Sequence, residues 1–423
     1  MRIYFSGIGG VGIGPLAEIA LDAGYEVVGS DTSKGLVTTQ LEERGVNLSY
    51  DQSGDFLHTQ HAATTIDWFV YTAALPDDHP ELVLARQLGI RVAKRDELLA
   101  YIVSEKNLKL IAIAGTHGKT TTTGMMVWVF KQLGIPVSYS IGTTLSWGAS
   151  GFYDPQSEYF IYECDEFDRN FLHFHPSLSI ITSIDYDHPD TYPTQQEYYD
   201  AFDQFIGQSD RCILWQQDFD IKATRQSKTI VHMIDKNAES VRDNIDGLHL
   251  AGRHNRENAY LILTECIDGG LDEQTVKAAL ESFPGTNRRF EKLADNLYSD
   301  YGHHPAEIAA TLQMAKEIAP QVVLVYQPHQ NVRQHEIIEQ YTDEIFKDAD
   351  EIYWLPTYLS REDPTLELLT PTQLTKNLSR VHTANLDDEL WHTIEATCQT
   401  GTLVLLMGAG TIDSWARAQL QSR

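Results

Sequence analysis

Three segments of the chain share one pattern, in which an apolar run of strand length meets glycines and then continues with helically spaced apolar positions. They begin at residues 2, 108 and 402. A short apolar run that ends in glycine predicts a buried strand, and apolar residues three or four positions apart predict one face of a helix. Between residues 296 and 329 strand and helix patterns alternate again. This alternation favours α/β domains built on parallel sheets.

The first segment, RIYFSGIGGVGIGPLAEIALDAGYEVVGSD, contains a glycine motif. Gly7, Gly9 and Gly12 fit G-x-G-x-x-G after a strand, and Asp31 ends the next strand. Glycines at this spacing let the backbone approach a diphosphate at a helix N-terminus, and the acid after the second strand binds a ribose in dinucleotide-binding folds. The motif by itself is compatible with a dehydrogenase or with plain strand–helix packing.

The second segment contains a shortened phosphate-binding loop. The usual pattern is G-x-x-x-x-G-K-[ST], whereas here only two residues separate Gly115 from Gly118, Lys119 and Thr120. The context is right, because the strand LKLIAIAG precedes the loop and a helix with an apolar face follows it. We expect the Lys119 ammonium to neutralise terminal phosphates and the Thr120 hydroxyl to reach magnesium.

Length and charge narrow the picture further. The chain has 423 residues, too many for one ordinary core, and a net charge of −28 from 60 acidic and 32 basic residues. A field of this sign repels polyanions, so we expect no nucleic-acid partner. No apolar run is long enough for a membrane span, and the opening stretch MRIYFSGIGG predicts a strand instead of a signal peptide. The four cysteines are widely spaced, which favours a reducing, cytoplasmic compartment.

Several short motifs in a fixed order make a family resemblance specific. The loop AGTHGKTTTT is followed along the chain by ECDEFDRNFLHFHPSLSIITSIDYDHPDTY, AGRHNRENA, NRRFE, DYGHHPAEI, YQPHQNVR and LLMGAGTI. With these blocks in this order the chain resembles the Mur ligases, whose ATP loop has the same short form. The resemblance runs from residue 3 to about residue 413. It implies a Rossmann-like domain over residues 1–107, a central P-loop ATPase-like domain over residues 108–287 and a Rossmann-like domain over residues 288–423.

The resemblance also implies a reaction. Mur ligases form an amide in peptidoglycan precursor synthesis: ATP phosphorylates a carboxylate, and an amine then displaces phosphate from the acyl phosphate. The first glycine loop, the ATP loop and DYGHHP look most like the branch that joins L-alanine to UDP-N-acetylmuramate. Expected partners are therefore UDP-N-acetylmuramate, ATP, two Mg²⁺ ions and L-alanine, in a monomer or weak homodimer.

Site residues are transferred from the family onto matching positions. The catalytic group would be Lys119, Glu163, His188 and Arg289, with Thr120, Glu163 and His188 as metal ligands. The ATP site would comprise Gly115, Thr116, His117, Gly118, Lys119, Thr120, Thr121, Asn255, Asn258, Arg289 and Asp300. The UDP-sugar site would comprise Gly7, Gly9, Gly10, Val11, Gly12, Asp31 and Thr72. The amino-acid side would comprise His303, His304, His329 and Arg333.

Simpler roles compete with some of these assignments. ECDEFD could be a solvated acidic turn, His188 could cap a turn, Asn255 could cap a helix, and the histidines after residue 302 could serve capping or core hydrogen bonds. Intact Lys119 and Arg289 argue against a non-catalytic nucleotide-binding protein.

Three positions depart from the family pattern and leave the amine open. Gln330 stands where an arginine is usual in the Q-P-H-R block, and Phe167 and Arg169 replace small residues. A sister ligase that adds another amino acid or a recycled peptide therefore remains an alternative. Its recycling form usually has a cysteine in the first glycine loop, where this chain has Gly9 and Gly10.

Overall fold

The computed structural model describes the chain in the ranges 1–10, 12–72, 75–188, 191–218, 228–360 and 362–422. Its described strands form three sheets of five, seven and six strands. Two compact units result, one made of residues 1–242 and 261–283 and the other of residues 243–260 and 284–423. The first unit holds the first two sheets, and the second unit holds the third.

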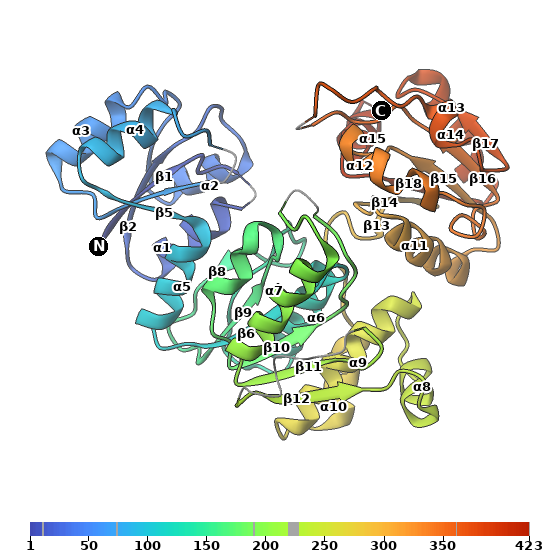
Figure 1. Ribbon diagram of the computed structural model, residues 1–423, viewed down its shortest axis with the longest axis horizontal. Helices are drawn as coiled ribbons and strands as arrows, with labels where there is room; N and C mark the ends of the chain where they lie inside the picture. Colours follow the sequence, from blue (N-terminus) through green and yellow to red (C-terminus); the bar gives the residue numbers. More distant parts are fainter. Residues whose placement is uncertain (11, 73–74, 189–190, 219–227, 361, 423) are drawn as a thin grey trace. The chain divides into compact units, whose positions relative to one another are not determined.

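The N-terminal sheet is entirely parallel, with the order β3-β2-β1-β4-β5. Its strands are β1 (Arg2–Ser6), β2 (Glu26–Ser30), β3 (Asn47–Ser49), β4 (Trp68–Tyr71) and β5 (Arg91–Lys94). Its helices are α1 (Gly14–Asp22), α2 (Leu36–Glu43), α3 (Asp55–Ala63), α4 (Pro80–Gln87) and α5 (Arg95–Glu105). Residues of α1, α2 and α5 pack on one face and residues of α3 and α4 on the other, as the blue domain of Figure 1 shows.

Strand alternation explains the two covered faces. Ile3 and Phe5 of β1 belong to the core beneath α1 and α5, whereas Tyr4 between them belongs to the core beneath α3 and α4. Successive side chains of a strand point to opposite faces, so an uninterrupted apolar strand needs a helical layer on both sides.

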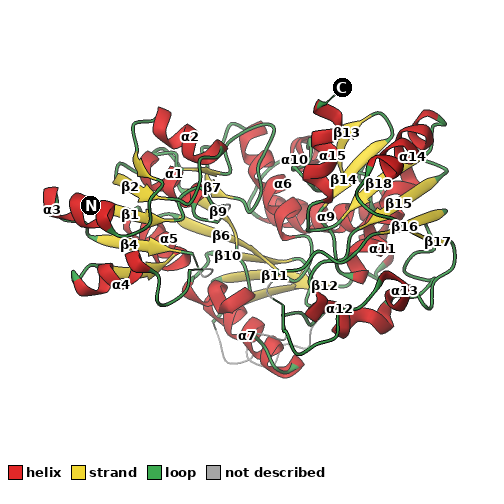
Figure 2. Cartoon of the chain, turned by 90° about the horizontal axis from the view of Figure 1, so that it is seen from above, coloured by secondary structure: helices red, strands yellow, loops and turns green. Residues whose placement is uncertain are grey.

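The central sheet has the order β12-β11-β10-β6-β9-β7-β8, and only its β7–β8 pair is antiparallel among the described strands. Its strands are β6 (Lys109–Ala114), β7 (Ser138–Ser140), β8 (Gly151–Phe152), β9 (Tyr159–Glu163), β10 (Leu178–Ile181), β11 (Arg211–Trp215) and β12 (Ile230–Ile234). Its helices are α6 (Lys119–Gln132), η1 (Phe167–His173), α7 (Gln195–Gln208), α8 (Glu239–Asp246), α9 (Arg253–Asp268) and α10 (Glu273–Glu281). In Figure 2 the sheet lies between α7 on one side and α6 with α10 on the other.

The C-terminal sheet has the order β13-β14-β18-β15-β16-β17, with an antiparallel β13–β14 pair at its edge. Its strands are β13 (Glu291–Ala294), β14 (Leu297–Asp300), β15 (Val322–Tyr326), β16 (Glu351–Trp354), β17 (Val381–Thr383) and β18 (Leu403–Met407). Its helices are α11 (Pro305–Ile318), α12 (Asn331–Ile337), η3 (Ile338–Gln340), α13 (Pro371–Leu374), α14 (Asp388–Gln399) and α15 (Ile412–Gln421). Residues of α11 cover one face, and residues of α14 and α15 cover the other.

The predicted organisation into three α/β domains is confirmed. All three glycine-containing segments form a strand, a turn and a helix, namely β1–α1, β6–α6 and β18–α15. Within the described part of the chain, no helix combines the length and the apolar character needed to cross a membrane.

Candidate active site

The short loop packs tightly against the neighbouring strand. Gly115 follows β6 with a φ of 130°, and a Cβ added to it would lie 2.3 Å from Thr182 Oγ1 and 2.8 Å from the Ser183 carbonyl oxygen. Gly118, with a φ of 83°, turns the chain into α6. Backbone of this kind suits glycine alone, so both glycines are required by the shape of the loop. The turn at Gly118 leads directly into the N-terminus of α6, a position that suits an anion.

Side chains of the loop fix it to the turn after β10. The Thr116 hydroxyl contacts the Tyr198 hydroxyl at 2.8 Å and donates to the carbonyl of Asp185, also at 2.8 Å. The His117 amide donates to Ser183 Oγ at 3.0 Å, and its imidazole lies 3.4 Å from the Asp185 carboxylate. Thr116 and His117 therefore hold the loop in place.

Lys119 is held by a buried carboxylate. Its ammonium donates to both oxygens of Glu166 at 3.0 and 2.8 Å and to the carbonyl of Gly115 at 2.6 Å. The Lys119 side chain is 14% exposed and that of Glu166 is 0% exposed. Burial lowers the pKa of Lys119, but the carboxylates of Glu166, Asp165 and Glu163 outweigh burial and raise it, so the ammonium stays charged.

Thr120 and Glu163 form a second contact beside the first. The Thr120 hydroxyl donates to Glu163 Oε1 at 2.7 Å, and the Gly142 amide donates to Glu163 Oε2 at 2.8 Å. Glu163 ends β9, at the carboxyl edge of a parallel sheet where ligand sites are usual. A hydroxyl and a carboxylate side by side are the hard oxygen donors that Mg²⁺ prefers, so the donor set fits the predicted ion.

His188 lies on the other side of Glu166. Its Nε2 is 3.8 Å from Glu166 Oε1 and 3.8 Å from Asp187 Oδ2, and its ring meets Phe167 edge-on at 5.2 Å between centroids. The residue has a φ of 59°, a strained value for a side chain with a Cβ. The structure thus places His188 against Glu166, and Glu166 links the predicted lysine to the predicted histidine.

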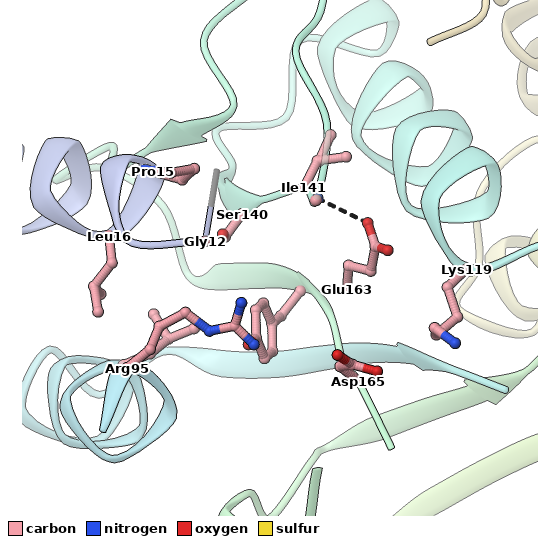
Figure 3. Close-up of a pocket in the computed structure, with 12 residues that line it drawn as sticks. Gly12, Pro15, Leu16, Arg95, Lys119, Ser140, Ile141, Glu163 and Asp165 are labelled. Atoms are coloured by element: carbon pink, nitrogen blue, oxygen red, sulfur yellow. Dashed lines mark hydrogen bonds between the residues drawn. The ribbon is translucent and has the colours of Figure 1, made fainter. Parts of the chain in front are cut away.

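A cavity of about 230 Å³ joins the first glycine loop to this site. Figure 3 shows Gly12, Pro15 and Leu16 on one side, Lys119 and Glu163 on the other, and the guanidinium of Arg95 between them. The strands β1 and β6, far apart in the sequence, therefore contribute their turns to one cavity. The space is polar where Arg95, Lys119, Glu163 and Asp165 meet, which suits an anionic ligand beside a cation.

Two residues of this site, Glu166 and Arg95, were not predicted from the sequence. Glu166 stands three positions after Glu163 in ECDEFD, so its motif was recognised but its side chain was not assigned. Arg95 opens α5, its guanidinium contacts Asp96 at 3.2 Å, and a Cβ on Gly12 would lie 2.8 Å from Arg95 Nη1. An arginine at a helix start carries no motif, so only the fold reveals that it reaches the glycine loop.

The predicted UDP-sugar residues gather around the first glycine loop. Asp31 follows β2 and accepts a hydrogen bond from the Gly9 amide at 2.7 Å, and Thr72 lies beside Gly7. The Gly10 amide closes a turn onto the Gly7 carbonyl at 3.0 Å. The remaining member of the predicted set, Val11, lies outside the described residues.

In the second unit, Arg289 and Asp300 form a local group around Tyr301. Asp300 ends β14 and accepts hydrogen bonds from the amides of Phe290 at 2.8 Å and Gly302 at 2.7 Å. Burial raises its pKa, and the guanidinium of Arg289 opposes that shift. The Arg289 guanidinium also lies 5.2 Å from the Tyr301 ring centroid.

Of the predicted amino-acid residues, His303 and His304 follow β14, His329 follows β15, and Arg333 lies on α12. The rings of His303 and His329 lie 5.8 Å apart, and His329 stacks on Tyr358 at 5.7 Å. Burial lowers the pKa of His303 to about 4, with the opposing influence of Glu307 second, so the imidazole is neutral at pH 7. His304 also has the simpler role, because its Nδ1 accepts the Ala306 amide at the start of α11.

Two predicted ATP residues, Asn255 and Asn258, lie on α9, and Gln330 is the position that departs from the family pattern. Gln330 has a φ of 61°, and its amide donates to the carbonyl of Tyr358 at 2.8 Å. Asn258 is buried, and Asn255 donates to the carbonyl of Ala251 at 3.0 Å. Asn255 therefore bonds to backbone just before its own helix, and its amide also contacts Met314 Sδ at 3.4 Å.

Three family models of known proteins match this chain. Residues 2–107 match the model of the Mur ligase family catalytic domain, residues 113–246 that of the Mur ligase middle domain, and residues 288–410 that of the Mur ligase glutamate ligase domain. Together the three models span most of the chain, and they do so in the order of its three sheets.

Solved structures share the fold over the full length. UDP-N-acetylmuramate-alanine ligase MurC from Thermotoga maritima is 24% identical, with a TM-score of 0.74 over 100% of this chain and 99% of that chain. The murein peptide ligase of Psychrobacter arcticus is 22% identical, with a TM-score of 0.65 over 100% and 98%. A pseudomurein peptide ligase type C from Methanothermus fervidus is 16% identical, with a TM-score of 0.62 over 100% and 99%. With its short nucleotide loop and three matched domains, the chain belongs to the Mur ligase family of ATP-dependent amino-acid ligases.

Proposed function

We propose that this protein joins L-alanine to the carboxylate of UDP-N-acetylmuramate in peptidoglycan precursor synthesis. The cavity between the first glycine loop and Lys119 carries the proposal, because it brings a diphosphate-binding motif and a nucleotide-binding lysine to one space. A substrate whose diphosphate lies on the glycine loop can extend its carboxylate past Arg95 toward Glu163 and Lys119.

The reaction is a phosphoryl transfer followed by an acyl transfer. An oxygen of the substrate carboxylate attacks the γ-phosphorus of ATP, and ADP leaves. The amine, once it has lost its ammonium proton, attacks the acyl carbon; a second N–H proton passes to solvent, and phosphate leaves with the original carboxylate oxygen. Such steps need positioned charges more than a protein nucleophile. Lys119 would bind the β- and γ-phosphates, and Arg95 would orient the carboxylate. Magnesium held by Thr120 and Glu163 would supply further positive charge at the phosphoryl oxygens.

The amine side is assigned to the second unit. A neutral His303 does not repel the ammonium of an incoming amino acid, and Arg333 offers a bidentate partner to its carboxylate. The rings of His329 and Tyr358 stack on each other, and the His329 ring meets His303 edge-on, so aromatic rings lie on this side of the proposed site. The choice of L-alanine rests on the likeness to the branch of the family that adds L-alanine.

A sister ligase with another amine is the second candidate. Gln330 is the observation that favours it, because an arginine is usual at this position and its absence removes a positive charge. The likeness to a murein peptide ligase is in the same range as the other structural matches.

Phosphate release from Mg-ATP and UDP-N-acetylmuramate tests the proposal, with L-alanine, glycine, L-serine and L-Ala-γ-D-Glu-meso-diaminopimelate compared as amines. We expect release that depends on L-alanine and is lost in Lys119→Ala. The exposed Lys347, paired with Glu344, provides the matched control, and Lys347→Ala should keep full activity. Release only with another amine would support the sister ligase. Binding of the UDP-sugar without any amine-dependent release would indicate a non-catalytic binding protein.

A further inference from the structure

A cluster of titratable side chains lies at the far edge of the central sheet, among elements that the proposed reaction does not use. His232 lies on the edge strand β12, and Glu265 and Asp268 lie one turn apart on α9. Arg211, the first residue of β11, lies beside them. All four belong to the first compact unit.

The three acceptor side chains converge on one point. His232 Nδ1 is 3.7 Å from Glu265 Oε1 and 3.6 Å from Asp268 Oδ2, and one ligand atom from each residue lies within 4.8 Å of the others. Bonds of about 2.1 Å in a tetrahedral site put ligand atoms roughly 3.4 Å apart. A small movement of these side chains would therefore bring the three atoms around one ion.

Glu265 contributes an independent sign of a missing partner. Its side chain is only 3% exposed, and Arg211 contacts its Oε2 at 3.0 Å. Its other oxygen, Oε1, is buried and makes no hydrogen bond to any described residue. That oxygen is also the one that lies nearest the imidazole of His232. A buried carboxylate oxygen without a donor is costly, and burial correspondingly raises the pKa of Glu265.

We propose that His232, Glu265 and Asp268 bind one divalent transition-metal ion, with Zn²⁺ as the best match. An imidazole with two carboxylates suits zinc, whereas magnesium and calcium prefer oxygen ligands alone. Arg211 contacts Glu265 Oε2 at 3.0 Å and Asp268 Oδ2 at 3.4 Å, and this leaves Glu265 Oε1 to the ion. A water molecule would complete a four-coordinate site.

The ion would stabilise the edge of the central sheet at β12. β12 pairs only with β11 among the described strands, and its Ile230 and Met233 are exposed. An exposed edge strand is a weak point of a sheet, and a ligand shared between β12 and α9 ties that edge to the helical layer. The site is therefore structural and separate from the magnesium ligands Thr120 and Glu163.

Zinc titration in the presence of excess Mg²⁺ tests the proposal, with a chromophoric chelator as competitor. Magnesium occupies oxygen-only sites, and the comparison of variants isolates the cluster from other histidines. We expect wild-type protein to bind one more Zn²⁺ than His232→Ala. Glu265→Gln should weaken that ion at least about tenfold, since even outer-shell changes reach 10–100-fold.

The control is His392→Ala, which removes an exposed histidine whose Nδ1 lies 3.7 Å from a single carboxylate, Glu395. It should bind as many ions as the wild type. Zinc should also raise the thermal unfolding temperature of the wild type and of His392→Ala, but not that of His232→Ala, since only bound ligand stabilises the folded state. Equal zinc stoichiometry and equal stabilisation in His232→Ala would overturn the proposal and leave the cluster as a set of ion pairs between Arg211, His232 and the two carboxylates.

Discussion

Glu166 is the residue around which the candidate site is organised. Its carboxylate receives two hydrogen bonds from Lys119, lies 3.8 Å from His188, and its backbone carbonyl accepts the Tyr192 hydroxyl at 2.6 Å. A buried ion pair stabilises a fold weakly in net terms, yet the loss of one partner leaves an uncompensated charge in a dry environment.

A double-mutant cycle on Lys119 and Glu166 measures this dependence. We expect Glu166→Gln to lower the free energy of unfolding by about 3 kcal/mol, because the buried ammonium loses its counter-charge. The double variant Lys119→Met/Glu166→Gln should recover most of that loss, since no charge is left buried. Urea unfolding of the four proteins provides the values. Additive effects would show that the two side chains do not depend on each other.

The spacing of a motif predicts which side chains face the ligand only where the backbone of the motif is rigid. G-T-H-G-K-T predicts that Lys119 and Thr120 face the ligand, because a strand and a helix fix both ends of the loop. ECDEFD does not say which acid faces the loop. Glu163 still belongs to β9, but Glu166 comes after the strand has ended, just before Asp168 and Arg169, which have φ values of 53° and 58°. That turn decides where Glu166 points, and no local pattern encodes it.

At the scale of elements, the short loop is shaped by the end of β10. Thr182 and Ser183 lie so close to Gly115 that the loop has no room for a side chain.

Gly115→Ala should therefore lower stability by about 2 kcal/mol and abolish ATP binding, because both a left-handed backbone and a 2.3 Å contact oppose the methyl group. The matched control is Gly207→Ala in α7, where an added Cβ meets nothing within 4 Å and alanine favours the helix by up to about 1 kcal/mol. Chemical denaturation and a fluorescent ATP analogue measure the two effects. Unchanged nucleotide affinity in Gly115→Ala would contradict the assignment of the loop.

Buried histidines of the second unit should make its stability depend on pH. Burial lowers the pKa of His254 and of His303 to about 4, from ordinary values near 6.5. As the pH falls, the histidines of the unfolded chain bind protons before those of the folded protein. Their contribution to the free energy of unfolding is therefore complete above pH 6.5 and declines between pH 6.5 and 4. Between pH 7.5 and pH 5 we expect each histidine to lower the free energy of unfolding by roughly 2 kcal/mol.

Urea unfolding at both pH values, in wild type and His254→Gln, checks this expectation. The variant should lose less stability than the wild type between pH 7.5 and 5, whereas a variant of the exposed His392 should behave like the wild type. An identical loss in His254→Gln would show that other groups govern the pH dependence.

The strands and helices were easier to predict than the order of the strands in each sheet. The strand and helix of each glycine-containing segment follow from local apolar spacing, and β6, α6, β15 and α11 form where the pattern places them. Sheet order depends on contacts between distant residues. β14 pairs with β18, so that Leu297 lies opposite Val404, and no periodicity within either strand indicates that pairing.

At the scale of the whole molecule, charge is the dominant feature. A net charge of −28 acts against any compact state through self-repulsion, and dissolved salt screens that repulsion. We expect the urea midpoint to rise steadily as KCl is raised from about 0.05 M to roughly 1 M, where the screening length falls to about 3 Å. A midpoint that fell or stayed level would show that local ion pairs outweigh the overall repulsion.

Three-domain organisation was predictable because each domain repeats the same local pattern and because the chain is too long for one core. The sequence did not predict that the first two domains would line one cavity. Gly12 and Lys119 belong to motifs far apart in the sequence, and only the packing of α5 against the central domain brings Arg95 between them.

If the loop binds the phosphates of ATP as proposed, the Lys119 ammonium would exchange the Glu166 carboxylate for a phosphate. A phosphate that draws the ammonium away leaves Glu166 buried without its counter-charge, and a ligand that brings no cation of its own cannot compensate. Mg-ATP arrives with that compensation, whereas metal-free ATP and inorganic phosphate do not. On the proposed function, the resting contact between Lys119 and Glu166 would therefore favour the metal complex over metal-free ATP and inorganic phosphate.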